Sequence, residues 1–138
     1  MNYNMAKYFR FVPVFILAML AFAGPLGAQD QQLKIIKAIT AGDAKELVKH
    51  FHQAVSLSLP GTDGVYNRIQ AENHLQKFFN DNKTLAFKIN HQGQSREGSR
   101  FLIGKMSTAT RKYNVYYLMK EIEGTEWIIQ FQIETSEE

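Results

Sequence analysis

The sequence predicts an α+β domain in which helices cover one face of a curved, mainly antiparallel sheet. Three observations support this prediction. Apolar residues recur at helical spacing from about residue 33, the period changes to two near Ala54, and the segments after Lys83 alternate as strands do. The expected order is α-α-β-α-β-β-β-β, with three helices and about five strands.

The first helices are indicated by apolar stripes and capping residues. Leu33, Ile36 and Ile39 share one helix face, and Gly42 ends that segment. Asp43 and Glu46 then have the spacing of a capping box, which starts a second helix. The stripe expected for this second helix is Ala44, Leu47, Val48 and Phe51.

A strand, a turn and a third helix follow. Val55, Leu57 and Leu59 alternate with serines, which is typical of a half-buried strand, and residues 60–64 have the composition of a turn. Asn67 and Gln70 repeat the capping-box spacing. The third helix should bury Ala71, Leu75, Phe78 and Phe79.

The remaining chain predicts a meander of four strands, which begin near residues 85, 99, 113 and 125. Apolar residues of one parity are expected on the inner face of the sheet. They are Leu85, Phe87, Ile89, Phe101, Ile103, Trp127, Ile129, Phe131 and Ile133. This set contains no carboxylate, so we expect no general base among these side chains.

The N-terminus has the organisation of a cleavable signal peptide over residues 1–28. Lys7 and Arg10 precede an apolar run of about a dozen residues, which Gly24-Pro25 interrupts. Ala28 is the expected residue before the cleavage site, with Ala23 as the alternative, and residues 29–138 would form a single domain. The run is too short for an ordinary membrane span. No cysteine is present for lipidation, so we expect a periplasmic or secreted protein that is not attached to the membrane.

Charge and composition argue against several classes of function. Lys7 and Arg10 are the only charged residues of 1–28, so the net charge falls from +3 to +1 when that segment is removed. A nearly neutral domain does not predict binding to nucleic acid. The absence of cysteine excludes disulfides, thiol nucleophiles and zinc-thiolate sites. We expect no metal site and no cofactor, because His50 and His52 would diverge on a helix.

Several stretches resemble one family of small exported proteins of Gram-negative bacteria, known only as a domain of unknown function. The order of the elements, at this length, resembles the nuclear transport factor 2-like (cystatin-like) fold, and the family resemblance covers nearly all of residues 31–134. The resemblance implies helices closing a bent sheet around a conical cavity, and it supplies no catalytic residue. The stretches that support it are Gly42-Asp43-Ala44-Lys45-Glu46-Leu47, Gly64-Val65-Tyr66-Asn67, Gln70-Ala71, Phe78-Phe79, His91-Gln92-Gly93-Gln94-Ser95, Ile103-Gly104 and residues 113–117.

The aromatic inner face predicts a non-enzymatic domain that binds a small apolar ligand or a protein partner in its cone. The predicted ligand-binding residues are His91, Phe87, Phe101, Trp127 and Phe131. An alternative is a small isomerase- or hydrolase-like enzyme that uses His91 with a tyrosine, since His91 ends an apolar strand face at the expected mouth of the cone. A third possibility for His91 is a structural hydrogen bond to the following loop.

The strand over residues 113–122 carries large apolar side chains on both faces. One face of an antiparallel sheet usually meets water, so this pattern suggests that the outer face is covered too. A homodimer through the sheet, with Tyr116 and Leu118 at its centre, is one interpretation. An exposed strand rich in tyrosine is the other.

Overall fold

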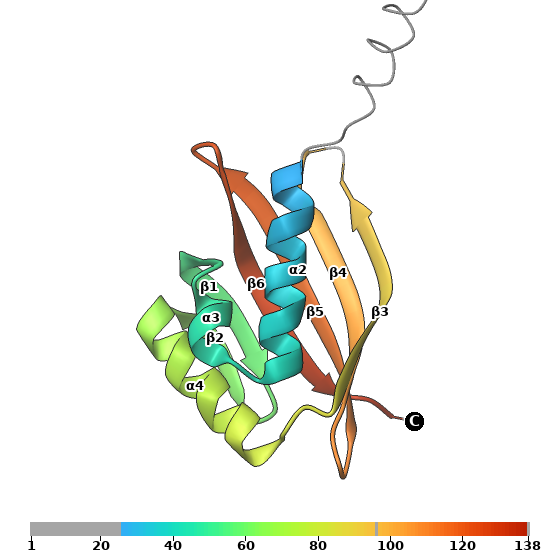
Figure 1. The fold of residues 1–138 in the computed structure, drawn as a ribbon. Helices are drawn as coiled ribbons and strands as arrows, with labels where there is room; N and C mark the ends of the chain where they lie inside the picture. The colour runs from blue at the N-terminus through green and yellow to red at the C-terminus, as the bar shows by residue number, and fades with distance from the viewer. Residues whose placement is uncertain (1–25, 96, 138) are drawn as a thin grey trace, which may run out of the picture. The chain divides into compact units, whose positions relative to one another are not determined.

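The computed structural model describes residues 26–95 and 97–137 (Figure 1). The chain divides into two compact units, residues 1–33 and residues 34–138, and the boundary falls inside the first described helix. The predicted n-region and apolar run of the signal peptide lie outside the described residues. No helix within the described ranges is long and apolar enough to cross a membrane.

The described part contains three helices and one sheet of six strands. The strand order is β2-β1-β6-β5-β4-β3, and every neighbouring pair is antiparallel except β1 and β6, which are parallel. The predicted α+β class is confirmed, and the sheet has one strand more than expected. The elements are α2 (Leu26–Ala41), α3 (Ala44–Val48), β1 (Phe51–Leu59), β2 (Thr62–Tyr66), α4 (Arg68–Asp81), β3 (Ala86–Gln94), β4 (Arg100–Ser107), β5 (Lys112–Ile122) and β6 (Thr125–Thr135).

The additional strand is β2, where a turn over residues 60–64 was expected. The chain turns instead at Pro60 and Gly61, and Gly61 takes the positive φ of 83° that glycine adopts easily. Thr62 then pairs with Leu59, and the ladder continues to Tyr66 opposite Val55. Pairing with β1 therefore overrides the low strand propensity of the Asp-Gly sequence.

The capping box at Asn67 and Gln70 forms as expected. At Asp43 only half of the expected box is present, because the Asp43 N–H donates to the Ala38 carbonyl and not to Glu46, and the second helix is shorter than predicted. Asn67 Oδ1 accepts from the Gln70 backbone N–H at 2.9 Å, and Gln70 Oε1 accepts from the Asn67 N–H at 3.1 Å. Helix α3 ends at Val48, so the prediction that it continues through Phe51 and His52 is wrong. Phe51 pairs instead with Ile128 of β6, and β1 therefore begins at Phe51.

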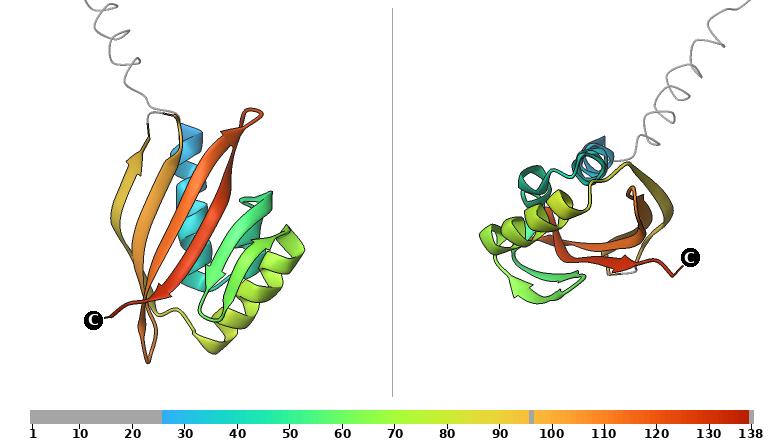
Figure 2. Two further views of the ribbon diagram at one scale, coloured as in Figure 1. Left: turned by 180° about the vertical axis from the view of Figure 1, so that it is seen from behind. Right: turned by 90° about the horizontal axis from the view of Figure 1, so that it is seen from below.

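The helices lie on one side of the sheet (Figure 2), and their apolar stripes meet the sheet in one hydrophobic core. Phe131 lies at its centre with no exposed surface. Its ring centroid is 5.5 Å from that of Phe51 and 6.4 Å from that of Tyr117. The fully buried side chains of the core include Ile35, Ile39, Leu47, Leu57, Leu75, Met106, Val115, Ile128 and Ile133.

In two strands, β3 and β6, a bulge changes which side chains point to each face of the sheet. In β3 the register with β4 shifts between Ile89 and His91. In β6 the register with β5 shifts so that Met119 pairs with Ile128 while Leu118 pairs with Gln130. A bulge inserts one residue, so side chains on either side of it no longer follow a single alternation.

Candidate functional site

The sheet has an inner face, which meets the helices, and an outer face, which no described helix covers (Figure 2). Residues directly opposite each other on paired strands share a face. The buried rows Leu102–Tyr117, Gly104–Val115 and Met106–Tyr113 therefore define the inner face on β4 and β5. The alternate rows, Phe101–Leu118 and Ile103–Tyr116, belong to the outer face.

The prediction that Phe101 and Ile103 face inward is therefore wrong. Phe101, Leu102 and Ile103 are all apolar, so periodicity does not distinguish the two faces of β4. On the inner face, the next position of β4 after Leu102 is Gly104, and the ring of Phe87 covers it. A Cβ built on Gly104 would lie 2.4 Å from Phe87 Cζ, which explains why glycine stands at this crossing.

His91 lies on the outer face, because the β3 bulge precedes it and it pairs with Ile103. Its side chain is exposed, and its ring centroid lies 5.6 Å from that of Phe101. The expectation that His91 stands at the mouth of the cone is therefore wrong. An acid–base role for His91 inside the cone has no support in this geometry.

Phe101 also covers Gly93 on the neighbouring strand. A Cβ built on Gly93 would lie 2.6 Å from Phe101 Cε1, so the ring fills the space that a larger residue would occupy. One continuous piece of the outer face is thus formed by His91, Gly93, Phe101 and Ile103.

The remaining predicted ligand residues separate. Phe87 is partly buried on the inner face, where its ring covers Gly104, and Phe131 is in the core. Trp127 pairs with the exposed Lys120 near the β5–β6 turn. The guanidinium carbon of Arg68 lies 4.7 Å from the Trp127 ring centroid. The five residues predicted to form one ligand site therefore do not surround one cavity.

Four large apolar side chains gather instead on two central strands of the outer face. They are Phe101 and Ile103 of β4 and Tyr116 and Leu118 of β5, and each remains partly exposed. We call this group the outer patch. Directly beside it, Lys105 of β4, Asn114 of β5 and Glu134 of β6 form one row across the same face.

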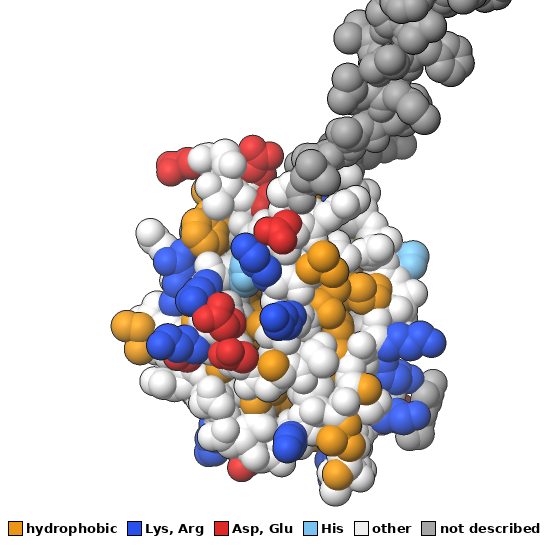
Figure 3. All heavy atoms as spheres, viewed as in Figure 1, with side chains coloured by type: hydrophobic (Ala, Val, Ile, Leu, Met, Phe, Trp, Pro, Cys, Tyr) orange, Lys and Arg blue, Asp and Glu red, His pale blue; other side chains and the backbone are white. Residues whose placement is uncertain are grey.

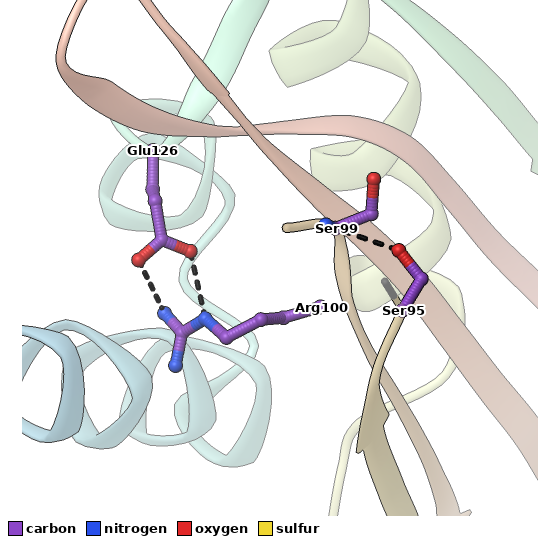
Figure 4. Close-up of polar contacts among 4 residues, drawn as sticks. All are labelled: Ser95, Ser99, Arg100 and Glu126. Carbon is purple, nitrogen blue, oxygen red and sulfur yellow. Dashed lines mark hydrogen bonds and ion pairs between the residues drawn. The ribbon is translucent and has the colours of Figure 1, made fainter. Parts of the chain in front are cut away.

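A polar pair that periodicity did not predict lies at the edge of the inner face. Arg100 Nε donates to Glu126 Oε2 at 2.7 Å, and Arg100 Nη2 donates to Glu126 Oε1 at 2.9 Å (Figure 4). The pair spans β5 from β4 to β6, and each side chain is about one-quarter exposed. Both carboxylate oxygens accept from Arg100, so Glu126 is engaged as an ion-pair partner and is not arranged as a free base.

Tyr117 lies on the same face as Arg100. Burial raises the pKa of the Tyr117 hydroxyl to about 12, and the nearby Arg100 guanidinium opposes this shift weakly. The hydroxyl therefore stays protonated at neutral pH and cannot act as a base there.

Basic and acidic side chains are interspersed over α2 and α3 on the helix-bearing side of the molecule (Figure 3). The ion pair between Lys49 Nζ and Glu46 Oε1, at 2.6 Å, belongs to this surface.

Comparison with known proteins agrees with this architecture. The family model described as a domain of unknown function, DUF4783, matches residues 33–134. A crystal structure of a DUF4783 family protein from Bacteroides ovatus is 30% identical, with a TM-score of 0.70 over 76% of this chain and 94% of that chain. No functionally curated protein matches the sequence.

More distant solved structures share the fold. An NTF-2 like protein of unknown function from Burkholderia xenovorans is 12% identical, with a TM-score of 0.60 over 80% of this chain and 83% of that chain. A protein described as a putative ketosteroid isomerase from Kribbella flavida is 10% identical, with a TM-score of 0.56 over 78% of this chain and 76% of that chain. These structures show that the fold is NTF2-like. Because the family model matches residues 33–134, this chain belongs to the DUF4783 family of domains of unknown function.

Proposed function

We propose that this domain is a non-enzymatic interaction module that pairs with a second copy of itself through the outer face of its sheet. The observation that supports the proposal is the outer patch, which places Phe101, Ile103, Tyr116 and Leu118 on neighbouring central strands. Aromatic and aliphatic groups at the centre of a surface are typical of protein interfaces. Among the described residues, the apolar side chains of the inner face pack against the helices in the hydrophobic core.

The row of Lys105, Asn114 and Glu134 favours a second copy over an unrelated partner. A two-fold axis parallel to β5 would place β4 of each copy opposite β6 of the other. Lys105 would then face Glu134 of the second copy twice, at symmetry-related positions, while Tyr116 and Leu118 would meet their own copies at the centre. Such self-complementarity is what an isologous interface requires.

Leu118→Glu is expected to weaken self-association by at least about tenfold, because it places a carboxylate at the desolvated centre of the interface. The measurement is sedimentation velocity of the purified protein over a range from about 1 to 100 µM. Ile69→Glu is the matched control: Ile69 is 72% exposed on α4, and this variant should associate like the unchanged protein. A wild-type protein that remains monomeric throughout the range would contradict the proposal.

Exchanging the charges of Lys105 and Glu134 tests, by the same measurement, how the two copies are oriented in the dimer. Lys105→Glu and Glu134→Lys should each weaken association, because each places like charges opposite one another. The double variant should recover most of the loss. Failure of the double variant to recover would exclude the proposed two-fold axis even if the outer patch forms the interface.

We also propose that the chain is exported and that residues 1–28 are removed. Cleavage after Ala28 would shorten α2 from Leu26–Ala41 to residues 29–41 and would keep the buried residues Ile35, Ala38 and Ile39. Intact-mass measurement of protein from the periplasmic fraction is expected to give a chain that begins at Gln29. An uncleaved chain recovered from the cytoplasm would refute export.

A further inference from the structure

A cleft of about 410 Å³ opens between the C-terminal half of α4 and the β1–β2 hairpin, and no part of the outer face contributes to it. We call it the α4 cleft and define it by the residues that the argument uses: Leu59, Pro60, Lys77, Asp81, Asn82 and Tyr113. Its volume is within the usual range of sites for small molecules.

Asn82 and Tyr113, which both line the cleft, offer it one acceptor and one donor. The Tyr113 hydroxyl donates its proton to Asn82 Oδ1 at 2.7 Å, so toward the cleft its oxygen acts as an acceptor. Asn82 Nδ2 donates to the Phe78 carbonyl at 3.0 Å, which uses one of its two N–H groups. The Tyr113 ring is held edge-on against Phe78, with the centroids 5.2 Å apart.

The rim carries one charge of each sign. Lys77 and Asp81 are exposed and lie four residues apart on α4, so their side chains leave the helix about 5–6 Å from each other at Cβ. No ion pair between them occurs among the described residues. Their order, lysine before aspartate, is the less favourable one for pairing along a helix.

Asp81 is also unfavourable for the helix itself. It is the last residue of α4, where the helix dipole is negative and where basic residues are preferred, and the last turn of α4 has no basic residue. A bound cationic group would offset this repulsion, so the Asp81 carboxylate is suited to bind the cationic group of a ligand.

From these features we infer that the α4 cleft binds a short peptide with free termini, about the size of a dipeptide. Its carboxylate would meet Lys77, its ammonium would meet Asp81, and an apolar side chain would contact Leu59 and Pro60. Two extended residues span about 7 Å, which is comparable with the distance of about 5–6 Å between the Cβ atoms of Lys77 and Asp81. The peptide amide would find both an acceptor and a donor in Tyr113 and Asn82.

The test is a titration of the protein with the dipeptide leucyl-alanine, followed by NMR at the backbone amides of Gly61, Thr62 and Asn82. Saturable shifts at these amides are expected at millimolar peptide. N-acetylation and C-amidation of the peptide should each weaken binding by about tenfold, since each removes one charge-assisted contact. Absence of saturable shifts, or equal binding of the capped peptides, would overturn the inference.

Variants assign each terminus to its partner. Lys77→Met should weaken leucyl-alanine by about tenfold and should leave the C-amidated peptide, which lacks the carboxylate, almost unaffected. Asp81→Asn should show the same selectivity against the N-acetylated peptide. Lys45→Met, at an exposed position of α3 outside the cleft, is the matched control and should bind like the unchanged protein. Equal losses for capped and uncapped peptides would contradict the assignment, and none of these results depends on whether the protein dimerises.

Discussion

Phe131→Ala is expected to lower the free energy of unfolding by about 3–5 kcal/mol, the range observed when a buried phenylalanine is truncated. Phe131 has no exposed surface, and its ring lies between those of Phe51 and Tyr117. Truncation would leave a cavity where β1, β5 and β6 meet, and backbone pairing on both sides of β6 limits how far the site can collapse.

Urea unfolding at one fixed protein concentration measures this loss, since a dimer would otherwise make the stability depend on concentration. Phe131→Leu is the matched control. It keeps much of the volume and should lose less than about 1.5 kcal/mol. A loss of similar size in both variants would show that cavity formation is not the cause.

Raising the pH from about 10 to 12 is expected to destabilise the protein by up to about 3 kcal/mol through Tyr117 alone. Burial raises the pKa of this hydroxyl from 10.0 to about 12 in the folded state. Between these values the unfolded chain releases the proton while the folded chain keeps it, so ionisation favours unfolding. Each pKa unit corresponds to about 1.4 kcal/mol. This contribution is fully present below pH 10 and is lost as the pH rises.

The measurement is the free energy of unfolding at several pH values above 9, compared between the protein and Tyr117→Phe. Phenylalanine preserves the ring against Phe131 and removes the titrating group, so the variant should lose less stability over this interval. Identical pH profiles would mean that the Tyr117 hydroxyl ionises normally in the folded protein.

The sequence predicted local structure well wherever one residue type and its near neighbours decide it. The capping box at Asn67 and Gln70 forms as expected, and the strands that flank the later turns are where alternation placed them. β2 was missed because its Asp-Gly sequence is turn-like, and only the backbone of β1 makes it a strand.

The candidate site was predicted less well, because it depends on which way each strand faces. Tyr116 and Leu118 were identified correctly as outer residues of a doubly apolar strand. Phe101 and His91 were placed on the wrong face, since a bulge in β3 and the covered Gly104 hide the alternation. Arg100 and Glu126 left only a weak signal, a charged residue at the start of each of two strands.

The sequence by itself therefore determined the fold class, the starts of α3 and α4 and the family of this protein, because periodicity, capping and family motifs are properties of neighbouring residues. The tertiary structure alone decided the faces of the strands, the outer patch, the Arg100–Glu126 pair and the α4 cleft. The physical reason is that bulges and strand pairing are set by contacts between segments far apart in the chain, and one inserted residue moves every following side chain to the opposite face.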